Sequence, residues 1–474
     1  MTLLQIIIII AICFLYRLCI NTKYIDWWVL CISLFVMFWY QPLSTIQTYD
    51  FWIPVISLSL GITAWFLVAD EDTKKKKENK ITGILIVLFV ALTGLLRFIP
   101  FINIQKFYSI PKFIWIMTYV VSVILILHLL NVSRKKTVFT WFLTGLIMCV
   151  FILIKNETLS YKISYLLRKL NNQSTNLAIS SEIIWIGYSY VAFRLIHTII
   201  DSKKKHGLNV SLKNYLIYLF YFPSFLAGPI EKMSNFIKEF SSINSSRKND
   251  FISAGKRIFI GLFQKFIIAD TLAVFSINKN LATEVTSTFW MWVIVIAYSL
   301  RIYFDFNGYT NLAIGTSKIL GIKLSENFKH PLRSPTLTIF WNNWHITLTQ
   351  WFRTYYFNPL TRFIKSKFIS LNQQFIIGFM QISTMALIGL WHGISCNFLA
   401  WGVWNGIGLF IQNNVSKFFI KNSCKQKPFW QISTLTQTTS IIFTFIYISL
   451  GWIWFALPSI KTSLQVFNVL LGNR

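Results

Sequence analysis

Apolar segments long enough to cross a lipid bilayer recur along almost the whole chain. A spanning helix needs roughly 20 apolar residues, and about eleven to thirteen segments between residues 3 and 457 approach that length. Only 13% of the residues are charged, against about 25% in a water-soluble domain, and 55% are hydrophobic. We therefore predict an all-α polytopic membrane protein with about 11–13 transmembrane or re-entrant helices.

The net charge of +29 lies mainly in short basic runs between the apolar segments, such as Lys74–Lys77, Arg134–Lys136 and Lys203–Lys205. Basic loops of membrane proteins stay in the cytoplasm, so the pattern predicts that the N-terminus lies outside. The same pattern makes membrane lipid the expected partner and argues against nucleic acid. The basic segment 156–180 departs from the rule, and its leucines at near-helical spacing predict an amphipathic helix at the membrane interface.

One apolar run is too short to cross a bilayer. It begins at Tyr215 and continues for about 13 residues before Gly228 and Pro229 interrupt it. Irregular backbone is tolerated at membrane depth only inside protein, so the run predicts a buried re-entrant helix. An ordinary short helix capped by a Gly-Pro turn is the alternative.

The window from Arg301 to Leu360 concentrates polar and turn-forming residues in an otherwise apolar chain. Burying such groups unpaired costs several kcal/mol each, so we expect them to line a water-accessible cavity or reaction site. A second polar island, GLWHGISCNFLAWGVWNG, contains His392. We predict that His345 and His392 form two halves of one site. The polar residues of the window are Asp305, Asn307, Lys329, His330, Arg333, Asn342, Asn343, His345, Gln350 and Arg353.

Within this window, glycine and alanine recur in GYTNLAIGTSKILG and predict a helix that packs closely against a neighbour. Prolines 331 and 335 then interrupt any helix, and Ser334 or Thr336 is suited to cap the next one. The aromatic stripe beyond them predicts one continuous helix from Thr336 to Tyr356.

Both site histidines stand in aromatic, apolar surroundings. Burial keeps an imidazole neutral and able to accept a proton near pH 7, which suits a general base. Two structural histidines bonded to backbone would explain the pattern equally well. His197, by contrast, is expected at the membrane interface, and a nucleophilic Ser395 or Cys396 beside His392 is a further alternative. The sequence holds no GxSxG, HExxH or P-loop, and its six scattered cysteines lack a CxxC, so no metal site is predicted.

The segments FDFNGYTNLAIGTSKILGIKLSENFKHP, FWNNWHITLTQWFR and GLWHGISCNFLAWGVWNG resemble, in order and spacing, the signatures of the membrane-bound O-acyltransferase (MBOAT) family. YFPSFLAGPIEKMSNF and GLFQKFIIADTLA are further similar segments. The likeness covers roughly residues 185–415 and is strongest to bacterial alginate O-acetylation and teichoic acid D-alanyl transfer proteins. It implies peripheral transmembrane helices in 1–182, an MBOAT-like catalytic core in 183–415, and a C-terminal helix and tail in 416–474.

The resemblance implies transfer of an acyl group, usually acetyl, from a cytoplasmic thioester such as acetyl-CoA to an extracytoplasmic hydroxyl. No permanently bound cofactor is expected. His392 matches the family's catalytic histidine, and His345 matches the histidine of the preceding motif. We expect a glycan acceptor, reached directly or through an SGNH-like relay partner. The expected supporting or substrate-binding residues are Asp305, Asn307, Asn342, Asn343, Trp344, Arg353 and Trp391.

The chain departs from the alginate-type pattern at Thr354, where an acidic residue is usual, and Thr354 cannot ionise. Two other transfer reactions fit the same likeness, namely D-alanyl transfer to teichoic acid and O-acylation of a lipid. A glycan or lipid transporter without chemistry is the alternative from outside the enzymes. Transporters of that kind often carry inverted repeats, and none is evident in the sequence.

Overall fold

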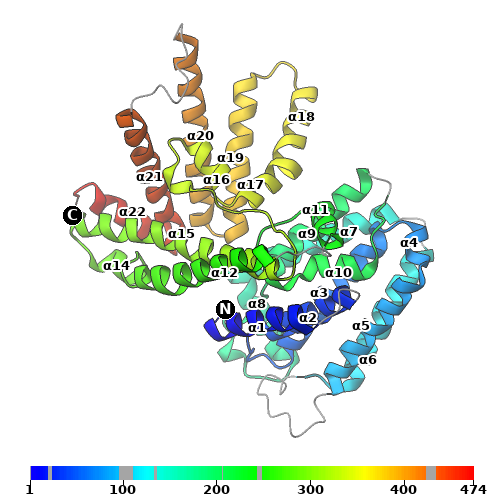
Figure 1. Cartoon of the computed structure of the whole chain (residues 1–474). Helices are drawn as coiled ribbons and strands as arrows, with labels where there is room; N and C mark the ends of the chain where they lie inside the picture. Colours follow the sequence, from blue (N-terminus) through cyan, green and yellow to red (C-terminus); the bar gives the residue numbers. More distant parts are fainter. Residues whose placement is uncertain are drawn as a thin grey trace. The chain divides into compact units, whose positions relative to one another are not determined.

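The computed structural model describes residues 2–19, 24–95, 110–132, 136–204, 207–242, 248–422 and 434–473. Within these ranges the regular structure is helical and no extended sheet occurs, which confirms the all-α prediction (Figure 1). Packing divides the chain into two compact units. The first holds residues 1–250 and 316–323, and the second holds 251–315 and 324–474. The division at 182 and 415 follows motif likeness rather than packing, and it stays a prediction.

The first unit is built mainly of apolar helices. The pair α5 and α6 and the pair α3 and α9 lie side by side. The helices of this unit are α1 (Leu3–Cys19), α2 (Ile25–Trp39), α3 (Tyr49–Val68), α4 (Glu71–Lys75), α5 (Lys77–Leu95), α6 (Phe113–Val132), α7 (Lys136–Lys155), α8 (Glu157–Leu170), α9 (Tyr188–Lys204), α10 (Leu212–Phe220) and α11 (Met233–Ser241).

Helix α10 is the short apolar segment of the sequence. It has nine residues, about 14 Å of helix, and nearly all of them are buried. Arg194 donates to the carbonyl of Leu219 at its end, and the Tyr218 hydroxyl lies 2.7 Å from Nε2 of His197. A helix that is short and buried all round favours the re-entrant interpretation. His197 is 1% exposed and thus lies inside the protein, and its expected depth at the membrane interface stays a prediction.

Helix α8 turns its polar side toward the protein. Ser160, Ser164 and Arg168 are buried at four-residue spacing, whereas Tyr165 and Leu166 are exposed. Lys162 and Lys169 are exposed on the same side, and such a mixture on a helix too short to span is typical of the membrane interface, which stays a prediction. Arg168 forms an ion pair with Glu182, so its charge is compensated.

The second unit contains the polar window and the second island. In Figure 1 α19 and α20 run side by side as a hairpin, and they share the most extensive helix packing of the unit. The helices are α12 (Lys248–Leu262), α13 (Asp270–Val274), α14 (Lys279–Glu284), α15 (Thr288–Ile319), α16 (Leu337–Asn343), α17 (Ile346–Phe352), α18 (Asn358–Lys367), α19 (Gln373–His392), α20 (Cys396–Asn422), α21 (Thr434–Ala456) and α22 (Ile460–Leu470), with π-helical turns at Phe263–Ala269 and Arg353–Phe357.

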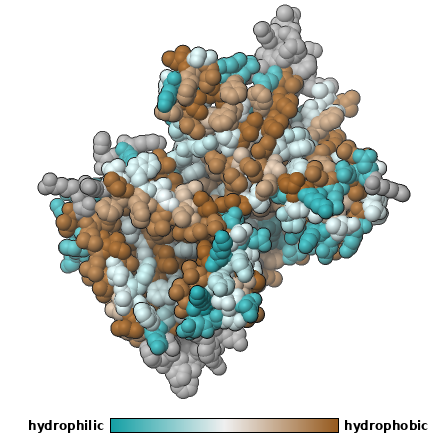
Figure 2. Space-filling view, turned by 180° about the vertical axis from the view of Figure 1, so that it is seen from behind, coloured by the Kyte–Doolittle hydropathy of each residue, from teal (hydrophilic) through white to brown (hydrophobic). Residues whose placement is uncertain are grey.

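Eight helical stretches among the described residues are long and apolar enough to cross a membrane, so the chain is a multi-pass membrane protein. Apolar side chains cover much of the surface seen in Figure 2. Two further apolar helices near the N-terminus, α1 and α2, are shorter than a bilayer. Of the predicted basic loops, Arg134, Lys135 and Lys205 lie outside the described residues. The eight stretches are 49–68, 77–95, 113–132, 136–155, 251–284, 288–319, 373–392 and 435–456.

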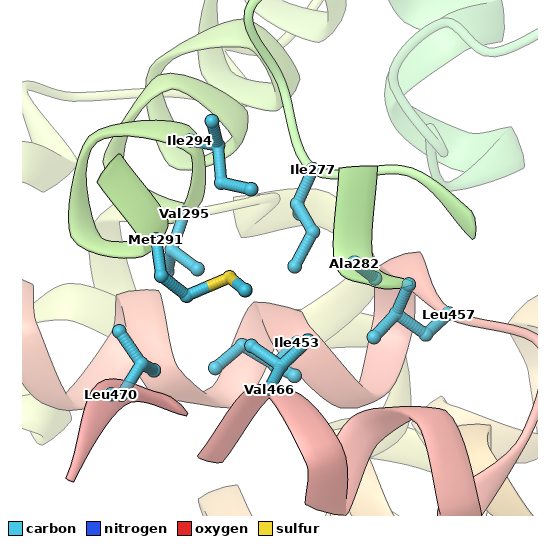
Figure 3. Close-up of a cluster of buried hydrophobic side chains, with 9 residues drawn as sticks. All are labelled: Ile277, Ala282, Met291, Ile294, Val295, Ile453, Leu457, Val466 and Leu470. Carbon is cyan, nitrogen blue, oxygen red and sulfur yellow. The ribbon is translucent and has the colours of Figure 1, made fainter. Parts of the chain in front are cut away.

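An apolar core in the second unit fixes α21 against the start of α15 (Figure 3). Met291 and Ile453 are fully buried in this core, and Val466 of α22 lies with them. Burying an aliphatic side chain stabilises a fold by about 1.5–3 kcal/mol, so the cluster holds α21 firmly in place. The neighbours of Ile453 on α21, Trp452 and Phe455, therefore reach the site below from a fixed helix. The cluster consists of Ile277, Ala282, Met291, Ile294, Val295, Ile453, Leu457, Val466 and Leu470.

Candidate active site

The predicted continuous helix from Thr336 to Tyr356 is wrong, because the chain breaks at Trp344 and His345. Thr336 caps α16 as predicted, and its hydroxyl accepts from the backbone N–H of Ile339. Trp344 is extended after α16, and His345 adopts a left-handed conformation with φ of 44° before α17 begins. Such a backbone is strained by about 1–2 kcal/mol for a residue with a Cβ, so tertiary contacts hold it there.

Asn327 provides those contacts. Its carbonyl accepts from the backbone N–H of Ile346 at 3.0 Å, and its Oδ1 accepts from the Thr347 hydroxyl at 2.6 Å and the Thr347 N–H at 3.4 Å. The first N–H groups of a helix have no partner within the helix, and His345 caps α17 with no side-chain bond. Asn327, itself fully buried, therefore caps α17 from a distant segment and fixes the break that presents His345.

His345 lies inside the second unit with 3% of its surface exposed. Its ring meets Phe306 edge to face, with 4.6 Å between centroids, and lies 6.0 Å from the indole of Trp391. Burial lowers the pKa of the His345 imidazole to about 3, so the ring is neutral at pH 7. Its Nε2 atom makes no hydrogen bond with any described residue, which leaves one ring nitrogen for a ligand.

His392 ends α19 and is only half-buried. Its ring lies 4.6 Å from that of Trp391, 4.8 Å from that of Phe455 and 5.5 Å from that of Trp401. Trp391 thus contacts both histidines, and the separation of the two imidazoles cannot exceed the sum of their two distances to its ring. Two residues far apart in the sequence meet around one indole.

The hairpin of α19 and α20 depends on glycine. A Cβ at Gly389 would stand 2.1 Å from the Phe398 carbonyl oxygen, and a Cβ at Gly402 would stand 2.3 Å from that of Met385. Only residues without a side chain allow the two backbones to approach this closely. The close crossing sets Trp401 of α20 beside His392 of α19.

The predicted close packing of α15 is also present. A Cβ at Gly308 would stand 2.9 Å from the Gly261 carbonyl oxygen of α12. Beside this crossing, Asp305 pairs with Lys265, and Asn307 donates to Gln264 at 3.2 Å. Both predicted supporting residues therefore have partners on the neighbouring helical stretch.

The remaining predicted supporting residues lie around the helix break. Arg353 donates to Oδ1 of Asn342 at 2.8 Å, and the Asn343 carbonyl accepts from the backbone N–H of Lys329. Trp344 is 4% exposed, and its ring stacks on Phe340 with 5.4 Å between centroids. These residues lie around the break that presents His345. Among the predicted supporting residues, Trp391 is the one whose ring contacts the imidazoles of both His345 and His392.

A cavity of about 150 Å³ lies beside this aromatic cluster. Nε1 of Trp341 and Oε1 of Gln381 are buried in its lining and make no hydrogen bond with any described residue, so they offer one donor and one acceptor. Trp341 also packs against Trp401, with 5.6 Å between centroids, and thus links the cavity to the ring beside His392. Its lining residues are Thr338, Trp341, Asn342, Thr349, Arg353, Phe357, Gln381, Thr384, Met385, Ile388, Leu409 and Asn413.

Other candidate groups lie apart from this arrangement or serve the backbone. The Ser395 hydroxyl accepts from the backbone N–H of Phe398 at the start of α20, and Cys396 is an exposed free thiol. His128 and His330 are exposed. No group of three histidine, cysteine or acidic side chains suited to a metal occurs among the described residues.

Sequence reasoning missed four residues that build the site, namely Asn327, Gln381, Trp401 and Phe455. Trp401 lies within the second island and has the same aromatic character as its neighbours, so its motif signalled it. Gln381 is a polar residue in the middle of an apolar helix, a signal for a functional position in a membrane protein. Asn327 lies within the first of the family-like segments, which did not reveal its capping role, and Phe455 carries no comparable signal.

The model of the membrane-bound O-acyltransferase family, MBOAT, matches residues 97–450. The match begins well before residue 185, where the motif likeness starts. It contains both site histidines and the whole of α15, α19 and α20, and it ends within α21, before Phe455.

Curated relatives match more than half of the chain. A protein named probable alginate O-acetylase from Pseudomonas putida is 30% identical over 292 residues, 60% of this chain and 55% of that protein. The peptidoglycan O-acetyltransferase of Helicobacter pylori is 31% identical over 262 residues, 55% and 46% of the two chains. The teichoic acid D-alanyltransferase of Bacillus subtilis is 30% identical over 280 residues, 58% and 69% of the two chains. This chain spans about half the length of the first two proteins.

Proposed function

The chain belongs to the membrane-bound O-acyltransferase family, and from that premise we propose that it transfers an acyl group from a thioester to a hydroxyl group of an extracytoplasmic polysaccharide or its relay partner. The observation that carries the proposal is the meeting of His345 and His392 around the indole of Trp391. Ionisable side chains are costly in the apolar interior of a membrane protein, and where they occur they usually have a function.

In the proposed reaction His392 acts as the general base. It takes the proton from the acceptor hydroxyl, the oxygen attacks the thioester carbonyl, and the thiolate leaves and receives that proton from the imidazolium. Half-buried His392 suits this role because a base must reach the substrate. The more deeply buried His345 is neutral and carries one donor and one acceptor nitrogen, which suits it to orient the reactants.

We assign the donor to the class of acyl thioesters whose arm carries amide groups, such as acetyl-CoA. An amide presents a carbonyl to the Trp341 N–H and an N–H to the Gln381 oxygen, the two unpaired groups of the 150 Å³ cavity. The donor is a substrate that enters and leaves, so no permanently bound cofactor is required. A carrier-protein thioester has the same arm chemistry and satisfies the same two groups.

For the acceptor we propose a polysaccharide of the cell envelope, and for the acyl group acetyl. The relatives named as alginate O-acetylase and peptidoglycan O-acetyltransferase support this choice. Teichoic acid D-alanylation is the second candidate, supported by a relative matched over 69% of its length. A location in the inner membrane and an SGNH-like relay partner on its outer side belong to the same proposal.

The test is mass spectrometry of the surface polymer from cells that express the His392→Ala, His345→Ala or His128→Ala variant. Loss of a general base lowers a rate by about 10²–10⁴-fold, so His392→Ala should abolish acyl incorporation at unchanged protein level, and His345→Ala should reduce it less. His128, exposed on α6, is the matched control and should leave it normal. The mass of the added group separates acetyl from alanyl transfer. Normal acylation in the His392→Ala variant would show that His392 is not the general base. If none of the variants changes the acylation of any polymer or lipid, the transporter alternative is favoured.

A further inference from the structure

The first unit contains a cavity of about 580 Å³ that takes no part in the histidine site. It lies where the first turns of α3 and α6 meet the loops before them, and residue 171 after α8 closes one side. We propose that this cavity binds a saccharide unit of the acceptor polymer on the extracytoplasmic face. The proposal rests on the proposed function for the identity of the polymer. Its lining residues are Gln47, Thr48, Trp52, Ile110, Pro111, Lys112, Trp115, Thr118, Tyr119, Ser122 and Asn171.

The lining combines flat aromatic rings with short polar side chains. Trp52 and Tyr119 lie with 5.2 Å between ring centroids, and Trp115 adds a third ring that is 62% exposed. A sugar ring has apolar C–H faces that stack on aromatic rings and hydroxyls that seek amide and hydroxyl partners. A pocket of several hundred Å³ with a few polar groups on an aromatic floor is of the size that holds such a ligand.

The hydrogen-bonding capacity of the lining suits hydroxyl groups. The hydroxyls of Thr118 and Ser122 donate to carbonyls of their own helix, so their remaining lone pairs act as acceptors. The amide N–H of Asn171 donates to the Leu167 carbonyl, which leaves its side-chain oxygen as a third acceptor. The Lys112 ammonium supplies donors. Sugar hydroxyls both donate and accept, and they match this mixture.

The wall of the cavity is held by its own network. Gln173 donates to the Thr45 carbonyl at 2.9 Å and accepts from the backbone N–H of Gln47 at 2.9 Å. The buried ion pair of Arg168 and Glu182 lies behind this contact, and Arg168 also donates to the Thr45 hydroxyl. The loop that carries Gln47 is thus fastened to the segment that carries Asn171, and a preformed site pays less ordering entropy when a ligand binds.

Charge places the cavity on the outer side. It lies at the N-terminal ends of α3 and α6, whereas the basic run Lys74–Lys77 follows the C-terminal end of α3, about 30 Å away along a 20-residue helix. Lys136, the first residue of α7, forms an ion pair with Glu71 next to that run, so it lies on the same side as the run. Basic loops face the cytoplasm, and the cavity then opens toward the extracytoplasmic polymer.

The experiment measures binding of deacylated oligosaccharides, released from the cell's own surface polymer, to the purified full chain. Trp115→Ala removes an exposed ring, and Ser122→Leu fills the cavity at an exposed helix position that tolerates leucine. Both should weaken binding about tenfold or more and raise the KM for the polymer, because the site binds ground state and transition state alike. Trp290→Ala, which removes an exposed indole from the second unit, is the matched control and should bind like the wild type.

The two proposals fail separately in this design. His392→Ala should bind the oligosaccharides normally while it transfers no acyl group, so intact transfer in that variant overturns the proposed function and leaves the cavity standing. Wild-type oligosaccharide affinity in both Trp115→Ala and Ser122→Leu overturns the saccharide site. A second result would also overturn it. If the wild type does not bind the oligosaccharides, and the two variants differ from it only by a weaker affinity for phospholipid vesicles, the cavity holds a lipid headgroup. Unchanged thermal unfolding midpoints show that both variants are folded.

Discussion

Replacing Asn327 by leucine tests whether a distant residue sets the position of His345. The change keeps the branched shape of the side chain and the backbone carbonyl but removes Oδ1, the acceptor for the hydroxyl and N–H of Thr347 at the start of α17. Loss of a helix cap costs about 0.5–2 kcal/mol, and loss of an acceptor for a buried donor costs about 1–3 kcal/mol. We expect a loss of about 2 kcal/mol in the free energy of unfolding, which corresponds to about 4–8 °C in Tm.

The functional effect follows from the strained backbone. With the cap removed, the left-handed conformation of His345 loses its support, the imidazole leaves Trp391, and acyl transfer falls with stability. Thermal unfolding of the purified chain and acyl incorporation in cells are the two measurements. Asn327→Asp retains an acceptor beside a helix N-terminus, where a carboxylate is favoured, and should lose less of both.

A double-mutant cycle makes the reasoning refutable. Thr347→Val removes the hydroxyl that Asn327 accepts, so Asn327→Leu with Thr347→Val should be more stable than the sum of the two single losses predicts. Simple additivity of the two losses would show that the side chains do not act together. Full activity and an unchanged Tm in Asn327→Leu would refute the role of Asn327 in holding the break.

Three further predictions concern the remaining structure. Gly402→Ala should destabilise the chain by about 1–3 kcal/mol in thermal unfolding, because the new Cβ meets backbone, whereas Gly255→Ala, with nothing within 4 Å, should be neutral or stabilising. Lys265→Met and Asp305→Leu should each lower stability and acyl transfer, because each leaves the other charge without its partner. The double variant should recover both properties. If the double variant is stable but inactive, Asp305 serves His345 directly. The arginine partner of Glu182 lowers the pKa of that carboxyl to about 2, so its contribution to stability is present above about pH 4.5 and is lost as the pH falls toward 2; Glu182→Gln should flatten this part of the stability profile.

Residues with regular patterns were predictable from the sequence. Long apolar helices such as α6 and α7 follow from length and hydropathy, and small residues at Gly308 correctly predicted close packing of α15. The shortness and burial of α10 agree with a run too short for a bilayer, and its re-entrant character stays a prediction. These features depend on local composition, and the bilayer limits what such composition can form.

The details of the site depend on contacts that no local pattern reveals. The stretch 336–356 has an unbroken helical period of aromatic residues, and it would continue as a helix if propensity alone decided. Asn327 ends it by satisfying the N–H groups of a new helix start, and its distance in sequence hides that role. In the same way, the polar window marked Asp305 as a supporting residue, but no local pattern showed that its carboxylate pairs with Lys265 of the neighbouring helical stretch.

Because Trp391 contacts both histidines, the site depends on two motifs that are separate in the sequence. His345 is presented by a strained break, and His392 by the end of a hairpin whose backbones touch at Gly389 and Gly402. Neither segment alone encloses an imidazole, since Phe306 of α15 and Phe455 of α21 complete the two ring shells. A change that separates α19 from α20 should therefore disturb His392 directly, and His345 only through the indole between them. Acyl transfer should fall less in Trp391→Phe than in Trp391→Ala, because phenylalanine keeps an aromatic ring between the two imidazoles.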